Sequence, residues 1–484
     1  MQSTTRNFKS NVSSALKNDN LQEALGKLKV GFVERRAAAA EKLPEFDALR
    51  DQARDIKNHT LQNIDLYLER FEEKVTAQGG HVHWARNSHE ACQTILEICQ
   101  SVDAKMVTKG KSMVSEEIGL NAALEKTGLE VVETDLGEYI IQLRKEAPSH
   151  IIAPAVHVLK DEVEADFREA HTDLDPDRQL EEPTQLVHEA REVLRQKYLD
   201  SDVGITGANF LVAETGTSII VTNEGNGDLT QTLPKVHIVI ASMEKIIPTL
   251  EDTSAVLRVL ARSATGQEFT SYTTFSSGPR REEDPDGPDQ YHVVILDNGR
   301  SAMLGTEFQD MLRCIRCGAC MNHCPVYGAV GGHAYGWVYP GPMGSVLTPS
   351  FIGVEEAGHL PNASTFCGRC EEVCPMRIPL PKMMRHYRQK EFEGNMNAAP
   401  VRWALKAYGF MATRPKLWRM ITGIKAKFAY TLSGGKGRFR KLPLWMGEWT
   451  KHRDFPASQG SSFQSQWKKK GGATSLSELK KGTE

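Results

Sequence analysis

Long apolar runs are missing from this sequence of 484 residues. No stretch approaches the roughly 18 consecutive apolar residues that a helix needs to cross a bilayer. The N-terminus is polar and charged, without the apolar core of an export signal and without a twin-arginine pair. We therefore expect a cytoplasmic protein. A length of 484 residues predicts two or three domains, and a hydrophobic content of 40% is enough to form their cores.

Recognisable nucleotide-binding motifs are missing as well. The chain carries no fingerprint of a flavin-binding or nicotinamide-binding fold, and the segment Lys109-Gly-Lys-Ser112 lacks the glycine that a phosphate-binding P-loop requires. Lys109 and Lys111 at the start of a helix could still bind an anion, or Ser112 could simply cap that helix. The sequence therefore does not show where an organic substrate would lose hydride.

Cysteine, by contrast, is concentrated in two places. Seven of the nine cysteines form two runs, Cys314-x2-Cys317-x2-Cys320-x3-Cys324-Pro325 and Cys367-x2-Cys370-x3-Cys374-Pro375. Three thiolates at such intervals can wrap one iron–sulfur cluster, and the cysteine before proline can ligate a second cluster. Zinc sites usually use two Cys-x2-Cys pairs instead, and disulfide frameworks belong to oxidising compartments. The runs therefore predict two iron–sulfur clusters.

In each run, the cysteine before proline is predicted to ligate the cluster that the other run holds, and this assigns the ligands. A complete second run would have a cysteine where this chain has Ser364, so the second cluster receives only three thiolates. Ser364 or another oxygen or nitrogen donor could complete a four-iron cluster, the site could hold a three-iron cluster, or one iron could stay open. We expect [4Fe-4S] at both sites, with [3Fe-4S] as the alternative at the second. The predicted ligands are Cys314, Cys317, Cys320 and Cys374 for the first cluster and Cys324, Cys367 and Cys370 for the second.

The remaining cysteines and one histidine need a different interpretation. Cys92 and Cys99 lie seven positions apart in a segment with helical periodicity, so we expect both to be buried as small hydrophobic residues. His323 precedes the last cysteine of the first run. It could tune a cluster through a hydrogen bond, but it is not counted among the ligands.

The chain divides into four regions by pattern. Residues 1–75 predict helices, and residues 76–300 alternate strands with helices, which indicates an α/β domain with a mostly parallel sheet. Residues 301–395 predict a helical ferredoxin domain with the two clusters, and residues 396–484 a basic, mostly helical region that is disordered from about residue 460. The expected strands are 81–84, 105–108, 129–132, 203–212, 213–222, 236–241 and 293–296, with helices over 89–100 and 116–126 and an acidic helical insertion over 161–198.

The C-terminal region differs from the rest in charge. From Val401 to Glu484 the chain has 18 Lys or Arg and 4 Asp or Glu, and five of the seven tryptophans: Trp403, Trp418, Trp445, Trp449 and Trp467. Such a segment best suits docking to the acidic body of this chain or to a partner protein. An anionic membrane surface is the second choice, and it would place the chain peripherally at the inner face of the membrane. Nucleic acid is a distant third.

Three short segments, together with the two cysteine runs, resemble a known family. They are Thr108-Lys-Gly-Lys-Ser-Met113, Ala213-Glu-Thr-Gly-Thr217 and Asn223-Glu-Gly-Asn226, which are similar to motifs of the lactate-utilisation (LUD) domain. A LUD domain followed by two cluster runs and a basic C-terminal region resembles the lactate utilization protein B family. The resemblance covers about residues 20–450 and implies a fold like that of glucosamine-6-phosphate isomerase, ribose-5-phosphate isomerase and the CoA transferases. The long connection between the cysteine runs resembles that of the helical ferredoxin domains of succinate dehydrogenase and fumarate reductase.

The resemblance also implies a function. It predicts an iron–sulfur electron-transfer subunit of a multi-protein system that oxidises L-lactate to pyruvate, with two companions: a cysteine-rich protein and a small LUD-domain protein. The alternatives are an electron relay for another quinone-linked hydroxy-acid dehydrogenase, or a CoA transferase-like or isomerase-like enzyme with structural clusters. In the last case Glu214 would be a candidate nucleophile, but hydrogen bonding to the backbone is the stronger interpretation, and Glu224 has the same status. We expect a ligand pocket near Gly207, Glu214, Gly216 and Asn223.

Overall fold

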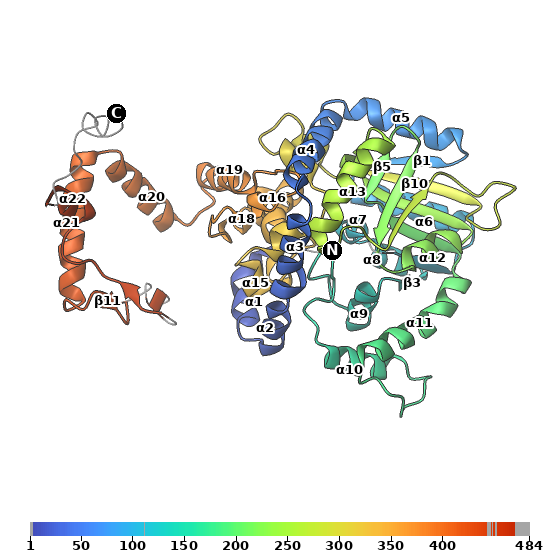
Figure 1. Ribbon diagram of the computed structural model, residues 1–484, viewed down its shortest axis with the longest axis horizontal. Coiled ribbons are helices and arrows are strands. Elements are labelled where there is room, and N and C mark those ends of the chain that lie inside the picture. Colours follow the sequence, from blue (N-terminus) through green and yellow to red (C-terminus); the bar gives the residue numbers. More distant parts are fainter. Residues whose placement is uncertain (1–2, 111, 443–446, 448, 451–452, 470–484) are drawn as a thin grey trace. The chain divides into compact units, whose positions relative to one another are not determined.

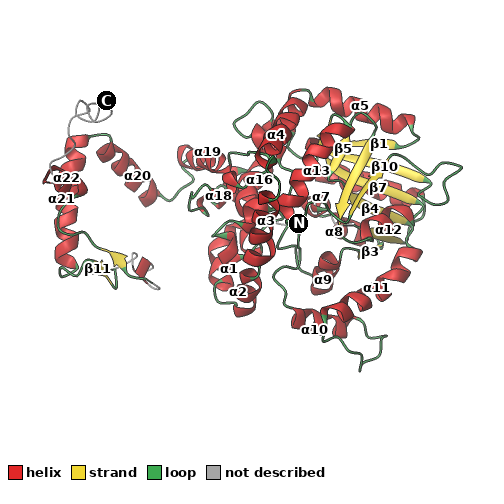
Figure 2. Ribbon diagram, viewed as in Figure 1, coloured by secondary structure: helices red, strands yellow, loops and turns green. Residues whose placement is uncertain are grey.

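The structure of the chain is a computed structural model that describes residues 3–110, 112–442, 447, 449–450 and 453–469. The chain forms two compact units, Met1–Glu391 and Phe392–Glu484. We describe each unit by itself, beginning with the larger one, which contains both sheets and both cysteine runs (Figures 1 and 2).

A six-stranded sheet forms the centre of the first unit. Its strand order is β1-β10-β7-β4-β2-β3, and every neighbouring pair is parallel. In β7 (Val236–Ser242), Ile238 and Ile240 pack into the core on one face, whereas Val239 and Ala241 pack into the core on the other. A parallel sheet covered on both faces requires such uninterrupted apolar strands. The other strands are β1 (His81–Ala85), β2 (Met106–Lys109), β3 (Glu130–Glu133), β4 (Val203–Gly207) and β10 (Gln290–Leu296).

Helices and a second sheet cover the two faces. The helices α6 (Ser88–Ser101), α7 (Met113–Ile118) and α8 (Leu120–Glu125) lie against one face. A second sheet with the order β8-β5-β6-β9 shares the core of the other face. Its strands, and the helices that complete this part of the unit, are β5 (Phe210–Val212), β6 (Thr217–Thr222), β8 (Ile246–Ile247), β9 (Tyr272–Ser276), α9 (Leu136–Arg144), α10 (Lys160–Ala170), α11 (Pro183–Asp200), α12 (Asn226–Thr232) and α13 (Leu250–Ala264).

The expected α/β pattern is present, with three differences. The expected strand 203–212 is two strands in two different sheets, because the chain leaves the parallel sheet after Gly207. The expected helix 116–126 is interrupted at Gly119, which has a φ of 70° and ends α7. Strands β8 and β9 were not predicted. The acidic insertion is helical as expected, and Cys92 and Cys99 are buried in α6.

The N-terminal helices pack against the cysteine-rich segment, far away in sequence. The backbone N–H of Thr4 donates to the carbonyl of Gly336 over 2.8 Å, and the Arg36 guanidinium donates to the carbonyl of Val373 over 2.8 Å. These helices are α1 (Phe8–Ala15), α2 (Asp19–Gly26), α3 (Arg35–Glu41), α4 (Phe46–Gln62) and α5 (Ile64–Ala77). The first unit is therefore built from three stretches of sequence that share contacts.

Short helices carry the cysteines. Each run contains Cys-Gly-x-Cys, and in both runs the glycine has a positive φ, 71° at Gly318 and 81° at Gly368. Each glycine directly precedes a four-residue helix. A residue with a side chain could adopt this positive φ only at a conformational cost. The helices of this segment are α14 (Ala319–Asn322), α15 (Tyr327–Val330), α16 (Gly341–Ile352), α17 (Val354–Ala357), α18 (Arg369–Glu372) and α19 (Leu380–Glu393).

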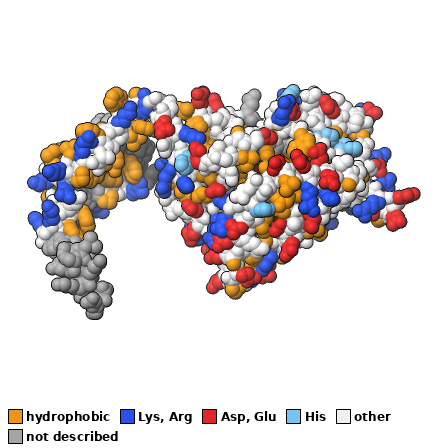
Figure 3. Space-filling model, turned by 90° about the horizontal axis from the view of Figure 1, so that it is seen from above, with side chains coloured by type: hydrophobic (Ala, Val, Ile, Leu, Met, Phe, Trp, Pro, Cys, Tyr) orange, Lys and Arg blue, Asp and Glu red, His pale blue; other side chains and the backbone are white. Residues whose placement is uncertain are grey.

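The second unit contains α20 (Ala399–Ala412), α21 (Pro415–Leu432), the antiparallel pair β11 (Arg438–Phe439) and β12 (Phe455–Pro456), and α22 (Phe463–Lys469). Basic and apolar side chains intermix over its surface (Figure 3). The prediction of disorder from residue 460 is wrong for α22, and for 470–484 it concerns residues outside the described ranges. Among the helices of the described ranges, none is both long enough and apolar enough to span a membrane.

Candidate iron–sulfur site

Cysteines from both runs surround one small cavity in the first unit. Its walls include Cys314, Cys317 and Cys320 of the first run and Cys374 of the second, together with apolar side chains such as Met343. These are the four cysteines predicted for the first cluster. The cavity is almost wholly apolar apart from its sulfur atoms, as expected for a group held by thiolates.

A second small cavity gathers the other three predicted ligands. Cys324 of the first run meets Cys367 and Cys370 of the second, and Ser364 and His323 also line this cavity. The Ser364 hydroxyl accepts a hydrogen bond from the backbone N–H of Phe366 over 3.1 Å, so it also shapes the turn before the second run. His323 Nδ1 lies 2.8 Å from the carbonyl oxygen of Ala319, which assigns the proton to Nδ1 and leaves Nε2 with a lone pair that could coordinate iron.

The spacing of the sulfur atoms separates the predicted clusters from the two alternatives. All nine cysteines are free thiols, so the disulfide framework is wrong. Four sulfurs about 2.3 Å from a single zinc would lie roughly 3.8 Å apart. In the part of the chain that the structure describes, which includes all seven cysteines, no three cysteine sulfurs lie within 4.8 Å of one another. The thiols surround a space wider than one zinc ion, which fits a cluster better.

Burial makes these thiols depend on a cationic partner. Burial raises the pKa of Cys317 and of Cys370 to about 12, and it also raises the pKa of Cys374. A bare thiolate in these positions is therefore unfavourable at neutral pH. Iron supplies the positive charge that keeps a coordinating thiol deprotonated, so the residues fit iron–sulfur clusters in both cavities.

Two arginines from the N-terminal helices hold the loop that carries Cys374. Arg50 of α4 donates to the carbonyl oxygen of Cys374 over 2.8 Å, and Arg36 of α3 donates to the carbonyl of Val373 over 2.8 Å. Both arginine side chains are buried. This role was not predicted, because a helical pattern does not reveal which distant backbone carbonyls its polar residues reach.

Buried charges join the cysteine-rich segment to the parallel sheet. Arg300 forms a two-pronged hydrogen bond with Glu117, over 2.9 and 2.7 Å, and lies 2.9 Å from a carboxylate oxygen of Glu244. Arg316, between the first two cysteines of the first run, reaches the other Glu244 oxygen over 3.3 Å. Burial alone would raise the pKa of Glu244, but Arg300 and Arg316 outweigh burial and lower it to about 2.

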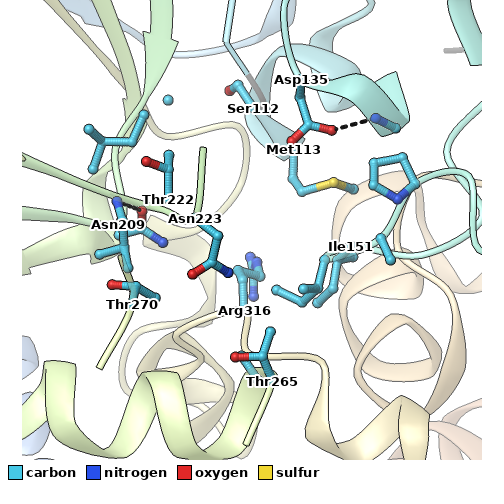
Figure 4. A pocket seen from close by; sticks show the side chains of 18 of the residues that line it. Ser112, Met113, Asp135, Ile151, Asn209, Thr222, Asn223, Thr265, Thr270 and Arg316 are labelled. Carbon is cyan, nitrogen blue, oxygen red and sulfur yellow. Dashed lines mark hydrogen bonds between the residues drawn. The ribbon is translucent and has the colours of Figure 1, made fainter. Parts of the chain in front are cut away.

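A much larger cavity of about 560 Å³ lies beside this network, and Figure 4 shows part of its lining. The parallel sheet contributes residues at or after the carboxyl ends of its strands: Ser112 after β2, Asp135 after β3, Gly207 in β4 and Lys245 after β7. Open α/β sheets commonly bind ligands at this edge. Arg316, Asn223 and the loop 151–156 complete the lining.

The predicted ligand pocket therefore exists, but with different members. Gly207, Asn223 and Glu224 line the cavity, whereas Glu214 and Gly216 are not among its lining residues. A carboxylate oxygen of Glu214 instead accepts a hydrogen bond from the backbone N–H of Leu250 at the start of α13, over 3.1 Å. Glu214 thus has the structural role that was weighed against nucleophilic attack.

Lys109 is not available for the anion site that was weighed at Lys109 and Lys111. The Lys109 ammonium is buried and lies 2.7 Å from carboxylate oxygens of both Glu116 and Glu133. Ser112 caps α7 by accepting a hydrogen bond from the N–H of Ser115, as the alternative interpretation held. Lys111 lies outside the described residues.

Sequence reasoning missed two residues of the large cavity, Arg316 and Lys245. Arg316 lies inside a cysteine run, where the cysteines give the clear functional signal. Its φ of 57° cannot be recognised in the sequence. Lys245 follows the most apolar strand of the sheet at its carboxyl end. That position was a usable signal, because ligand-binding groups collect at this end of parallel strands.

Comparisons with known proteins agree with this arrangement. The LUD domain family matches residues 68–296, the 4Fe-4S dicluster domain family matches residues 310–378, and the family described as Lactate utilisation protein B, C-terminal, matches residues 387–472.

Full-length relatives point the same way. Lactate utilization protein B of Bacillus velezensis is 44% identical over 470 residues, which are 96% of this chain and 97% of that protein. Lactate utilization protein B of Bacillus subtilis is 44% identical over 463 residues, with 94% and 95% covered. The uncharacterized electron transport protein YkgF of Escherichia coli is 40% identical over 474 residues, with 97% and 98% covered. The chain belongs to the lactate utilization protein B family.

Proposed function

We propose that this chain is the iron–sulfur electron-transfer subunit of a multi-protein system that oxidises L-lactate to pyruvate. The observation that carries the proposal is the interleaving of the two cysteine runs around two neighbouring cavities, four cysteines at one and three at the other. The names of its relatives, lactate utilization and electron transport, support the same role.

The cysteines would hold the groups that carry single electrons, and the rest of the unit would hold the cysteines. Cys314, Cys317, Cys320 and Cys374 are proposed ligands of a first [4Fe-4S] cluster, and Cys324, Cys367 and Cys370 of a second. Ser364 and His323 line the second cavity and offer a fourth donor for a four-iron cluster; with neither bound, [3Fe-4S] is the alternative. Arg316, next to Cys314 and Cys317 in the chain, places positive charge where a reduced cluster gains negative charge.

Two further features belong to the same proposal. The companions are a cysteine-rich protein and a small LUD-domain protein, which would remove hydride from the substrate and feed electrons to this chain. The α/β part is proposed to share the fold class of glucosamine-6-phosphate isomerase and the CoA transferases, in keeping with its parallel six-stranded sheet.

The C-terminal unit is proposed to bind an anionic membrane surface. From Ala399 to Leu432 the sequence has seven Lys or Arg and no Asp or Glu. In the same two helices Trp403 is 71% exposed, Phe428 64% and Ile424 61%. Exposed aromatic and aliphatic side chains beside positive charge suit a headgroup layer with anionic lipids.

Growth on defined carbon sources tests the central proposal. A strain that lacks the gene for this chain should not grow on L-lactate but should grow normally on pyruvate. Wild-type protein should restore growth on L-lactate, as should the Cys92→Ser variant, whereas Cys317→Ser and Cys370→Ser should not. Normal growth of the deletion strain on L-lactate, with no other lactate-oxidising enzyme present, would contradict the proposal. A growth defect confined to another 2-hydroxy acid would favour a relay for that acid.

A further inference from the structure

Lys245 is a buried cation whose ammonium contacts no carboxylate directly among the described residues. It ends the short helix η3 (Met243–Lys245), and only 6% of its surface is exposed. Its side chain lines the 560 Å³ cavity. Among the described residues, the Lys245 ammonium forms no hydrogen bond and no ion pair within 4.0 Å. A buried ammonium is costly unless a negative charge or hydrogen-bond acceptors compensate it.

The surrounding charges do not balance. Lys57, Lys245, Arg300 and Arg316 bring four positive charges, and Glu117, Glu244 and Cys314, as a thiolate ligand, bring three negative ones. Both carboxylates are already engaged, Glu117 by Arg300 and Glu244 by Arg300 and Arg316. One positive charge is left over at the edge of the cavity. The free-energy cost of removing a charged group from water is offset only when the buried charges are paired.

Two other carboxylates line the cavity, and neither serves Lys245. Asp135 accepts hydrogen bonds from the backbone N–H groups of Gly137 and Glu138, over 3.0 and 3.2 Å, at the start of α9 (Figure 4). Glu224 is exposed at the rim and forms no ion pair with Lys245. The positive end of the cavity is therefore available to a negative group from outside the chain.

The remainder of the lining is largely apolar. Ile151, Ile152 and Val156 come from the loop that precedes α10, and Ile220 and Val221 come from β6. The volume of about 560 Å³ lies within the roughly 300–1,000 Å³ of pockets that hold drug-sized ligands. A three-carbon acid would leave most of this space, and most of the apolar surface, unfilled.

We propose that this cavity binds an organic carboxylate larger than lactate. Its carboxylate lies between Lys245 and Arg316, and its apolar body packs against Ile151, Ile152 and Val156. Because Arg316 belongs to the first cysteine run, the bound carboxylate lies next to the first cluster site. The inference holds whether or not the system oxidises lactate, because it depends on the cavity alone.

Calorimetry with a graded set of probes tests this inference on the full-length, cluster-containing chain. 4-Phenylbutyrate should bind at least tenfold more tightly than acetate, and at least tenfold more tightly than its neutral amide. Lys245→Met should weaken 4-phenylbutyrate binding at least tenfold. Ala208→Trp should also block binding, because it fills the cavity and leaves both cations in place. Lys126→Met, which removes an exposed lysine outside the cavity, should bind like wild type.

Stability without a probe provides a second reading. A lysine that only supports the fold or the first cluster should, when replaced by methionine, lower the melting temperature or the iron content. If Lys245 instead serves to bind a ligand, its replacement by methionine should leave the iron content unchanged and the melting temperature equal to or higher than that of wild type. Unaltered 4-phenylbutyrate affinity in Lys245→Met would overturn the inference. The inference would also be overturned if none of the carboxylate probes bound at a concentration of about 10 mM, at which even weak ligands bind.

Discussion

Arg300 lies where the parallel sheet meets the cysteine-rich segment, and its side chain is fully buried. It pairs with Glu117 of α7, which also accepts hydrogen bonds from Tyr339 over 2.6 Å and from Asn298 over 2.7 Å. These contacts connect the turn after β10 and the segment between the cysteine runs to one carboxylate. Glu117 therefore joins these segments to the network that Arg300 and Glu244 continue.

Replacing Glu117 by Gln should destabilise the first unit by about 3 kcal/mol, because the buried Arg300 charge would lose one of its two carboxylate partners and keep only Glu244. Chemical denaturation under anaerobic conditions measures the loss. The matched control is Glu45→Gln, which breaks an exposed ion pair with Arg258 and should change the midpoint little. Equal midpoints for wild type and Glu117→Gln would show that the pair does not hold the segments together.

Single cysteines should separate the two clusters. Cys370→Ser removes a thiolate from the second cavity only, so iron content should fall by about half while the first centre remains. Iron and sulfide analysis with electron paramagnetic resonance measures this, with Cys92→Ser as the control that removes a buried thiol outside both cavities. Loss of both centres, or of neither, would argue against the assignment of four and three ligands.

At the scale of elements, helix α4 acts as a brace for the second cysteine run. Arg50 reaches the carbonyl oxygens of both Glu372 and Cys374 from a position more than 300 residues earlier in the chain. The brace explains why the N-terminal helices belong to the same compact unit as the cysteines.

Arg50→Met should remove the side-chain donor from both carbonyls, at a cost of about 1–3 kcal/mol, and leave the Cys374 carbonyl with only the backbone N–H of Arg377. Because Cys374 would then be held less firmly, a chelator should strip iron from the first cluster faster than from wild type. Arg54→Met, one turn along α4 and more exposed, is the matched control and should behave like wild type. Identical rates of iron loss for Arg50→Met and wild type would refute the brace.

The elements also show what the sequence could and could not predict. The parallel strands were predictable because each is a short apolar run between polar helices, as in 236–241. Strand β8 has only two residues and β9 is half exposed, so neither gives a clear periodic signal. The grouping of the cysteines was predictable from spacing. The contributions of Arg50 and Arg316 were not, because they arise from contacts between distant segments, whereas the position of Lys245 after β7 was a signal in the sequence.

At the scale of the whole molecule, the C-terminal unit should bind vesicles that contain anionic lipid. Each Lys or Arg near such a surface contributes about 1 kcal/mol, so the Lys416→Gln, Lys425→Gln and Lys427→Gln triple variant should bind roughly 100-fold more weakly. Cosedimentation of the full chain with vesicles measures this.

Two controls accompany the vesicle experiment. Vesicles of neutral lipid alone should bind weakly, and glutamine at Lys9, Lys17 and Lys126, which are exposed on the first unit, should have little effect. If the triple variant binds anionic vesicles as wild type does, the basic unit has another partner, such as an acidic protein.

The central claim is that one chain holds two reducible centres between interleaved cysteine runs. A redox titration of the anaerobically purified full-length protein, followed by electron paramagnetic resonance with iron and sulfide quantified on the same sample, tests it most directly. The account predicts two centres that reduce at separate potentials, because their ligand sets differ. A protein with one centre, or one that contains stoichiometric zinc and no reducible iron, would contradict it.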